Sequence, residues 1–323
     1  MKVLFLTTEW PTNDRPNDVP FLVQYVAALR HQGVEIEVFH FIGHGNPLNY
    51  FHAWFKLRKH PSWKQVDILH AHWGQSAVPA IFSRKPLIIT YHGSDLQGIV
   101  GESGSYSLKG RLLVAVNKIL ARKADQCVVV SRRLAEFLPP SCSPIEVIPM
   151  GIDLNLFKPM PKAEARRMLG LDQDIRYVLF VTDPNRPEKR FYLAQQAVSR
   201  VGLHIVKLLV VSGQPHEKIP IFLNAGDLLL LTSSHEGSPV IIKEALACNL
   251  PVVSVNVGDV REQLENISGC VICEDDSVDT ISNAIKKALA YPYPIDGRES
   301  VRALSWDLIA KRTISLYQNC LEE

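Results

Sequence analysis

Short, wholly apolar runs recur along the chain and alternate with segments of helical periodicity. Such runs suit strands buried on both faces of a parallel sheet, because a half-exposed strand would alternate apolar and polar residues. A helix is predicted from Phe21 to His31, where apolar residues follow a helical period and Gly33 is a typical stop signal. In the first half, strands are predicted at 2–6, 35–41, 67–71, 87–91, 127–130 and 145–149.

The same alternation continues in the second half and ends in a predicted helix over about 305–321. Alternating strands and helices imply right-handed crossovers, and hence an α/β fold with parallel, doubly wound sheets. Residues 150–162 contain prolines and lack periodicity, which predicts an interdomain linker. We therefore expect domains at 1–155 and 156–304, with 305–323 as a C-terminal helix packing back toward the first. Strands of the second half are predicted at 177–182, 206–211, 228–231, 252–255 and 270–273.

Composition narrows the class of protein. A chain of 323 residues that is 46% hydrophobic can bury a large core, and its net charge of +2 gives no reason to expect nucleic acid. Polar residues interrupt the N-terminal apolar run after six positions, and no apolar run reaches the roughly 18 residues of a membrane span. Six irregularly spaced cysteines then indicate reduced thiols of a cytoplasmic protein, and Cys270 and Cys273 are expected to pack in a strand.

Candidate chemistry concentrates where the apolar run 228–231 leads into a helix. Ser238 is predicted to cap this helix and Pro239 to be its first residue. A helix that starts at the carboxyl end of a parallel strand is a typical phosphate site. Glu236 precedes the helix and Glu244 lies inside it. Two carboxylates beside phosphate are better suited to sugar hydroxyls, so a nucleotide-sugar fits this junction.

This junction resembles the retaining glycosyltransferases of the GT-B fold, family 4, through E-x7-E in EGSPVIIKE followed by ALACNLPVVSVNVGDVRE. The resemblance covers nearly the whole chain and is closest to bacterial enzymes that build cell-surface polysaccharides. It implies two Rossmann-like domains facing each other across a cleft, with the acceptor in the first and a nucleotide-sugar in an abbreviated second. Supporting matches are VIPMGIDLNLFKP (147–159), RPEK (186–189), YHGSDL (91–96) and SW (305–306).

The resemblance also assigns roles in the second domain. Glu236 contacts the donor hexose, and Glu244 binds the ribose hydroxyls. Arg186 and Lys189 neutralise the diphosphate leaving group, so no metal or other cofactor is expected in the absence of a DxD motif. The family places an arginine directly after the strand, whereas here it comes later, and RPEKR also fits a solvated turn. The remaining donor-binding candidates are Gly237, Ser238, Pro239, Val240, Ile241 and Arg190.

In the first domain, the resemblance places His92 against the donor sugar or the acceptor. His72 ends another strand in the same way and is a second candidate, although a structural role stays open for both histidines. The loop 11–21 stands where the family carries a Gly-Gly pair. Asp18 and Phe21 of this loop are expected to enter the cleft.

Residues 51–64 interleave aromatic side chains with four basic ones. As one amphipathic helix they would suit an anionic membrane surface, where lipid-linked acceptors reside, and a peripheral position at its inner face. A packed helix with a solvated basic side fits the segment equally well.

The sequence thus predicts a metal-independent retaining hexosyltransferase that uses a nucleotide diphosphate-sugar and a glycan or lipid-linked acceptor. The alternative is a degenerate member that binds nucleotide-sugar or glycan without catalysis, because the Gly-Gly pair is missing and the segment 214–222 is short. A nucleotide-sugar epimerase on the same fold is a third possibility, although it needs further acid/base carboxylates.

Overall fold

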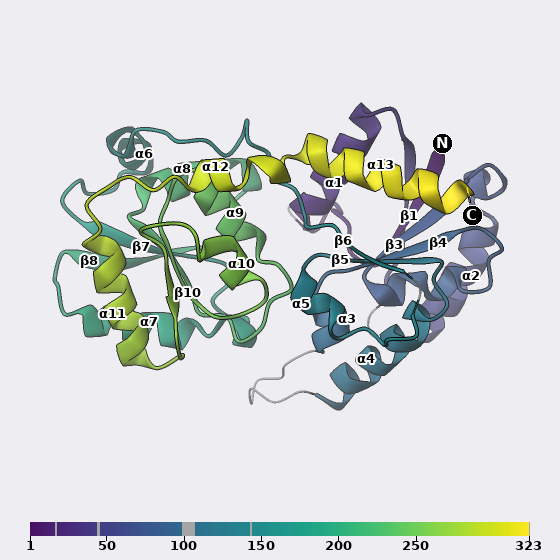
Figure 1. Cartoon of the computed structure of the whole chain (residues 1–323), viewed down its shortest axis with the longest axis horizontal. Helices are drawn as coiled ribbons and strands as arrows, with labels where there is room; N and C mark the ends of the chain where they lie inside the picture. The colour runs from purple at the N-terminus through teal and green to yellow at the C-terminus, as the bar shows by residue number, and fades with distance from the viewer. Residues whose placement is uncertain (17, 44–45, 99–106, 143, 323) are drawn as a thin grey trace. The chain divides into compact units, whose positions relative to one another are not determined.

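The computed structural model describes residues 1–16, 18–43, 46–98, 107–142 and 144–322 (Figure 1). The described residues up to Gly151, together with the final helix from Trp306, form one compact unit. Ile152–Ser305 form the other. Each unit contains its own parallel sheet, so the predicted α/β architecture with two doubly wound sheets is confirmed.

The first unit is built on six parallel strands in the order β2-β1-β3-β4-β5-β6. Burial on both faces explains the apolar runs, since Val3 to Leu6 of β1 are all 0% exposed. The strands are β1 Lys2–Thr7, β2 Glu35–His40, β3 Ile68–His72, β4 Leu87–Tyr91, β5 Gln126–Val129 and β6 Ile145–Val147. The helices are α1 Pro20–His31, α2 Leu48–Arg58, α3 Ser94–Gln97, α4 Leu108–Ala121 and α5 Arg132–Ala135, with 3-10 turns η1 Pro61–Lys64 and η2 Gly74–Ala80.

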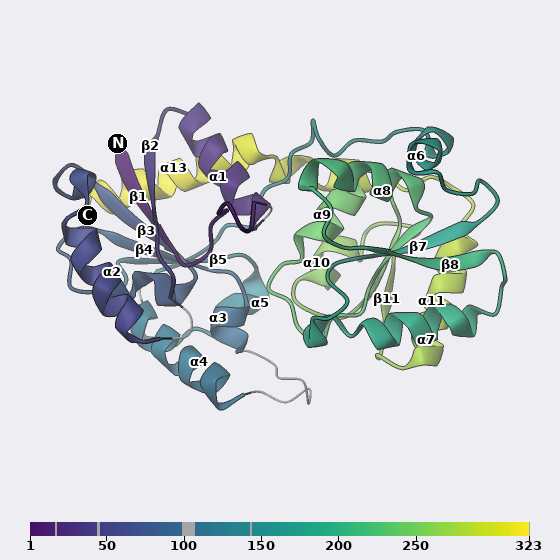
Figure 2. The same ribbon diagram turned by 180° about the vertical axis from the view of Figure 1, so that it is seen from behind.

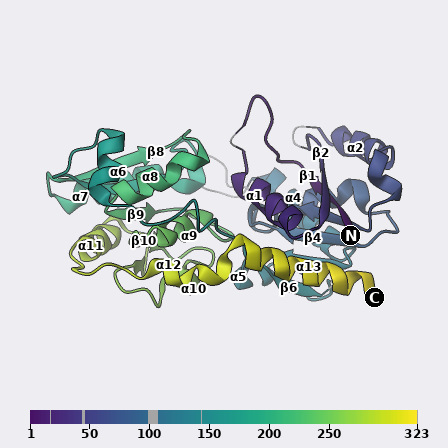
Figure 3. The same cartoon turned by 90° about the horizontal axis from the view of Figure 1, so that it is seen from above.

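The final helix, α13 (Trp306–Glu322), completes this unit by packing along α1 (Figure 3). Trp306 stacks on Tyr25 with ring centroids 5.7 Å apart and donates from Nε1 to Gln24. A Cβ at Gly151 would lie 2.5 Å from the Trp306 ring, so only glycine allows this approach. The last helix is therefore part of the first unit's core.

The second unit holds five parallel strands in the order β11-β10-β9-β7-β8. Helices α7 and α11 pack beside each other (Figure 2). The strands are β7 Arg176–Val181, β8 Val206–Val211, β9 Leu228–Leu231, β10 Val252–Val255 and β11 Val271–Cys273. The helices are α6 Lys162–Leu169, α7 Phe191–Val201, α8 Ile219–Ala225, α9 Val240–Ala247, α10 Val260–Leu264, α11 Val278–Leu289 and α12 Gly297–Ser300, with η3 Pro187–Lys189, η4 His216–Lys218 and η5 Arg302–Leu304.

The segment predicted as a linker, 150–162, is packed, and from Ile152 onward it belongs to the second unit. Phe157 is 0% exposed and lies in the hydrophobic core. The guanidinium of Arg298 donates to the carbonyl oxygens of Phe157 and Leu154, both at 2.6 Å. These bonds satisfy backbone groups that a loose linker would expose to water. Arg298, more than a hundred residues away in sequence, could not be matched to this segment from its pattern.

The single amphipathic helix expected over 51–64 is wrong. Helix α2 ends at Arg58, and Pro61 begins the separate turn η1. The proline lacks an N–H and pushes His60 into an extended conformation, which ends the helix. Arg58 is also withdrawn from solvent, since its guanidinium lies 3.9 Å from the Trp54 ring centroid. In the part of the chain that the structure describes, no helix is long and apolar enough to cross a membrane.

Candidate functional site

The loop between β9 and α9 is not held by the helix cap that the sequence predicts. Pro239 occupies the cap position before Val240, and no side chain caps the helix, so the predicted Ser238 cap is wrong. Ser238 Oγ instead donates to Asp259 Oδ2 at 2.7 Å and accepts from Lys243 Nζ at 2.9 Å. A carboxylate and an ammonium are stronger hydrogen-bond partners than a backbone N–H, which explains the exchange.

Lys243 and Asp259 form a buried anchor that the sequence analysis missed. Burial lowers the pKa of Lys243 to about 8, although the charges of Asp259 and Glu244 oppose this shift. Gly258 brings the Asp259 loop close, because its φ is +55° and a Cβ there would lie 2.9 Å from the Glu236 carbonyl oxygen. The sequence contains both residues, Asp259 in the GDV of 258–260 and Lys243 five residues after Ser238, but neither motif shows which side chain the other contacts.

Glu236 and Lys189 meet directly. Lys189 Nζ lies 2.6 Å from Glu236 Oε1, and the two side chains are only 14% and 15% exposed. Strands β7 and β9 are neighbours, so the segments that follow them run together. The Thr232 hydroxyl donates to the carbonyl of Lys189, and the N–H of Ser234 donates to that of Glu188. Glu236 and Lys189, which were both predicted from the sequence, therefore lie in direct contact.

The two arginines beside Lys189 are placed otherwise. Arg186 is 56% exposed and pairs with Glu188 at 2.5 Å. Arg190 has φ +50°, donates from Nε to the Thr232 carbonyl at 2.7 Å and pairs with Asp276. Arg190 thus braces the loop after β9 through protein partners, whereas its expected contact with the donor has no support in this geometry. Arg186 faces solvent next to the site.

Glu244 is the second carboxylate at this end of the sheet. His216, from η4, lies 2.7 Å from Glu244 Oε1, and the Phe157 ring packs against the imidazole at 5.2 Å. Burial lowers the pKa of His216, but the hydrogen bond and charge of Glu244 outweigh it, so the pKa lies above its usual value. His216 was missed because it belongs to the short segment after β8, which follows no motif.

In the first unit, histidines and aromatic rings gather at the ends of β3 and β4. His92 follows β4, and its Nε2 lies 3.1 Å from His72 Nδ1. Phe21 and Trp73 pack against His92 with ring centroids 5.5 and 4.6 Å away. Burial lowers the pKa of His92 to about 3, so the imidazole is neutral at pH 7.

His72 lies beneath this layer. It is 0% exposed and stacks on Phe5 with centroids 4.7 Å apart. His72 thus has no exposed surface for direct contact with acceptor or sugar, and its Nδ1 contacts His92 instead. The neighbouring His70, whose partners the sequence did not reveal, contacts Tyr317 Oη at 2.6 Å and Thr90 Oγ1 at 2.7 Å.

Asp95 fixes the loop that carries His92. It is fully buried and accepts hydrogen bonds from the N–H groups of His92, Gly93 and Gly74 at 2.9 to 3.2 Å. Burial raises the pKa of Asp95 to about 6, although these hydrogen bonds lower it in part. The carboxylate thus holds backbone and does not face a ligand.

Phe21 and Asp18, the two candidates from the N-terminal loop, have different surroundings. Phe21 is the second residue of α1 and adjoins His92. Asp18 is partly exposed, and its carboxylate lies 3.9 Å from the Arg15 guanidinium. Among the residues whose placement is described, no three His, Cys, Asp or Glu side chains gather in a way that could hold a metal ion.

Comparison with known proteins assigns the family. The model for Glycosyltransferase Family 4 matches residues 2–156, and that for Glycosyl transferases group 1 matches 171–302. The chain belongs to the group 1 glycosyltransferases. In this group 1 chain, the first match lies almost wholly in the first unit and the second match lies in the second unit.

Individual relatives agree with this assignment. TuaC of Bacillus subtilis (strain 168), assigned as a teichuronic acid biosynthesis glycosyltransferase, is 31% identical over 60% of this chain and 54% of its own length. The chain thus spans about half the length of this relative. Sucrose-phosphate synthase from Thermosynechococcus elongatus shares the fold with a TM-score of 0.79 at 19% identity, covering 99% of both chains. Anabaena HepE, solved with UDP, has a TM-score of 0.68 at 18% identity and covers 99% of this chain and all of its own.

Proposed function

We propose that this chain is a retaining glycosyltransferase that moves a hexose from a nucleotide diphosphate-sugar to a glycan or lipid-linked acceptor. The observation that carries the proposal is the pairing of Lys189, at the end of η3, with Glu236, in the loop before α9. Family membership supports a nucleotide-sugar donor, as does the UDP bound to the structural neighbour HepE. The role of TuaC in teichuronic acid biosynthesis supports a polysaccharide product.

The second unit binds the donor in this proposal. The diphosphate lies at the start of α9, against Gly237 and the backbone N–H groups of Ser238, Val240 and Ile241. Pro239 shapes this turn without a donor of its own. Breaking the sugar–diphosphate bond leaves negative charge on the departing phosphate and positive charge on the sugar. The ammonium of Lys189 stabilises the first charge, which a divalent metal would otherwise do.

The two glutamates contact different sugars. Glu236 accepts hydrogen bonds from the transferred hexose while Lys189 holds its carboxylate in place. Glu244 accepts from the ribose. His216 occupies Oε1 of Glu244, and the second carboxylate oxygen suits a ribose hydroxyl.

The first unit serves the acceptor. A neutral imidazole can exchange hydrogen bonds with a hydroxyl without attracting phosphate, so His92 suits a sugar. Phe21 provides a partly exposed aromatic ring beside it, and the buried Trp73 supports the imidazole from within the unit. Exposed aromatic and basic residues of α2 support contact between this unit and a membrane surface, where a lipid-linked acceptor would reside.

The proposal is tested by assaying transfer and donor hydrolysis with a panel of nucleotide-sugars. Glu236→Ala should reduce transfer by roughly 1,000-fold, since one lost electrostatic contact at a reacting centre typically costs 100- to 1,000-fold. The exposed Glu265→Ala is the matched control and should retain normal transfer. NMR of the product should show the donor's anomeric configuration, and EDTA should have no effect. Near-normal transfer by Glu236→Ala, or an inverted product, would refute the proposal.

The binding-only alternative is favoured by one observation, the engagement of Glu244 by His216. It predicts that a donor stabilises the protein without being hydrolysed or transferred. At a hundred times its Kd, a donor should add about 2.7 kcal/mol to the free energy of unfolding. Stabilisation with no turnover across the panel and with added acceptors selects this alternative.

A further inference from the structure

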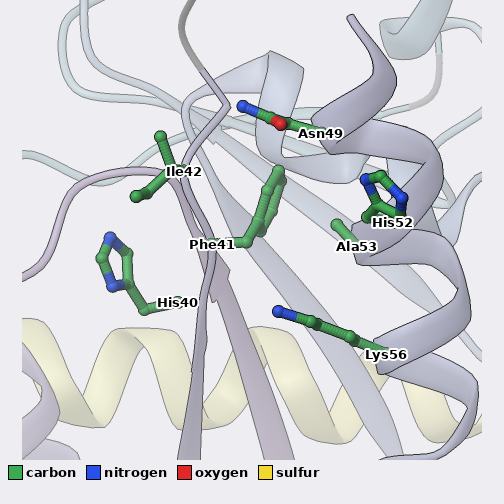
Figure 4. A pocket seen from close by; sticks show the side chains of 7 residues that line it. All are labelled: His40, Phe41, Ile42, Asn49, His52, Ala53 and Lys56. Atoms are coloured by element: carbon green, nitrogen blue, oxygen red, sulfur yellow. The ribbon is translucent and has the colours of Figure 1, made fainter. Parts of the chain in front are cut away.

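A cavity of about 580 Å³ lies in the first unit, between the end of β2 and helix α2. Figure 4 shows Lys56 and Asn49 extending from the helix toward the strand end, while Phe41 extends from the strand toward the helix. His40 and Ile42 line the cavity from the strand and His52 from the helix. Nothing in the candidate site described above involves these residues.

The polar groups of this cavity suit an anion. They comprise the ammonium of Lys56, the amide of Asn49 and the imidazoles of His40 and His52, which together offer several hydrogen-bond donors. Among the described residues that line the cavity, none is Asp or Glu, and no described carboxylate pairs with Lys56. A ligand phosphate would therefore meet a cation that no protein acid has neutralised.

An apolar strip runs along the same helix beside the cavity. Leu48, Phe51 and Phe55 are 61%, 57% and 45% exposed, and their spacing of three and four residues places them on one side of α2. Ile42, at the strand end, is 60% exposed. Exposed large apolar residues that adjoin each other mark an interaction surface more often than isolated ones do. A basic cavity and an apolar surface thus lie together on one element.

Sheet topology relates this cavity to His92. Strands β2, β1, β3 and β4 are successive parallel neighbours, so their carboxyl ends share one edge of the sheet. The cavity follows β2 and His92 follows β4. Three spacings of about 4.8 Å put the two strand ends about 14 Å apart. A short glycan could bridge that distance within the unit.

We propose that the cavity between β2 and α2 binds the phosphate of a lipid-linked acceptor, with the apolar chain lying on Leu48, Phe51 and Phe55. This inference rests on the proposed function for the presence of a glycan on that phosphate. It names the chemistry of the acceptor: a phosphate ester between an apolar chain and a sugar. The cavity selects the phosphate, and the strip selects the chain.

The test measures binding of the full chain to neutral phosphatidylcholine vesicles that carry a few mole per cent of a polyisoprenyl monophosphate. Matched vesicles carry phosphatidylglycerol at equal surface charge, and inorganic phosphate is titrated alone. The wild type should bind the polyisoprenyl phosphate at least tenfold more tightly than phosphatidylglycerol. Lys56→Gln should remove most of this preference, as should His52→Gln.

Lys59→Gln is the matched control, since Lys59 is exposed on the same segment but does not line the cavity. It should weaken binding to both anionic vesicles equally. Equal binding of the two lipids by the wild type would overturn the proposal in favour of a general membrane surface. Saturation by inorganic phosphate alone, or loss of preference in Lys59→Gln to the extent seen in Lys56→Gln, would also overturn it.

These measurements need neither donor nor turnover, so they fail independently of the proposed function. If the wild type shows lipid preference but no nucleotide-sugar stabilises it, the phosphate site in the cavity is retained and the transferase proposal is rejected. A wild type that transfers sugar without lipid preference keeps the transferase and loses the cavity.

Discussion

The carboxyl ends of the two sheets differ in the side chains they carry: charged pairs in the second unit, and uncharged rings at β3 and β4 of the first. In the second unit the strand ends carry ion pairs: Lys189 with Glu236, His216 with Glu244 and Arg190 with Asp276. In the first unit, the ends of β3 and β4 carry aromatic rings and histidines whose pKa values are lowered by burial.

This difference matches the two partners proposed for the units. A diphosphate donor brings charge that changes during transfer, and fixed charges stabilise it. A sugar hydroxyl brings none, and a neutral imidazole with aromatic neighbours is sufficient. Charge in the second unit should therefore control turnover, whereas charge introduced into the first should cost stability.

The largest effect is expected from acid. The pKa of His70 is about 3 when folded and about 6.5 when unfolded, so the unfolded state binds the extra proton. Stability should therefore be complete above pH 6.5 and fall as pH drops toward 3, by up to about 5 kcal/mol from His70 alone. Urea unfolding followed by tryptophan fluorescence at successive pH values measures it. His70→Asn should make the slope shallower by about 1.4 kcal/mol per pH unit; an unchanged slope would contradict the assignment.

Next is the pair of cations after β7. Lys189→Met should lower kcat by about 100- to 1,000-fold, because Lys189 is only 14% exposed and is paired with Glu236. Arg186→Met should lower it by less than about tenfold, since Arg186 is exposed and already paired with Glu188. Steady-state transfer assays compare the two. Equal losses would show that Arg186 moves into the site when donor binds, and would contradict the expected difference.

The glycine that seats the Glu236 loop should have an intermediate effect. Gly258→Ala places a methyl group 2.9 Å from the Glu236 carbonyl oxygen at φ +55°, and should cost about 1–3 kcal/mol of stability. Gly213→Ala is the matched control, because its φ is +66° but nothing lies within 4 Å of its Cβ. It should cost only about 1 kcal/mol. Thermal unfolding gives both values, and indistinguishable costs would mean that the close approach is unimportant.

The smallest effect is expected at Asp276. Its pairing with Arg190 is partly exposed, so Asp276→Asn should cost about 0.5 kcal/mol or less. Transfer should change little, because Arg190 still donates to the Thr232 carbonyl. Should transfer fall tenfold or more, with stability unchanged, Arg190 would have to be counted with the donor-binding residues.

The parts of the fold set by local pattern could be predicted. Apolar runs located the strands to within one or two residues, and the periodicity of Phe21 to His31 located α1. Predictions failed where a distant partner decides the outcome. Ser238 is a good local cap, but Asp259 competes for its hydroxyl. The segment 150–162 looks like a linker until Arg298 closes on it.

The site shows the same division. Glu236 and Lys189 could be proposed from motif spacing, because the order of strands brings their loops together. His216 and Lys243 could not, since His216 meets Glu244 from the separate turn η4 and Lys243 turns back from α9 to Ser238 in the preceding loop, and no motif spacing identifies either partner. The burial of His72 could not be predicted for a related reason: the fact that a residue ends a strand does not show how many side chains cover it.

The packing of α13 on the first unit has a consequence for biosynthesis. Tyr317, which hydrogen-bonds His70, leaves the ribosome only after every residue of the second unit has been translated. The second unit can thus fold while the first still lacks the helix that covers Tyr25 and His70. A released chain truncated after Ser305 should hold a protease-resistant Ile152–Ser305 segment beside a cleavable N-terminal one.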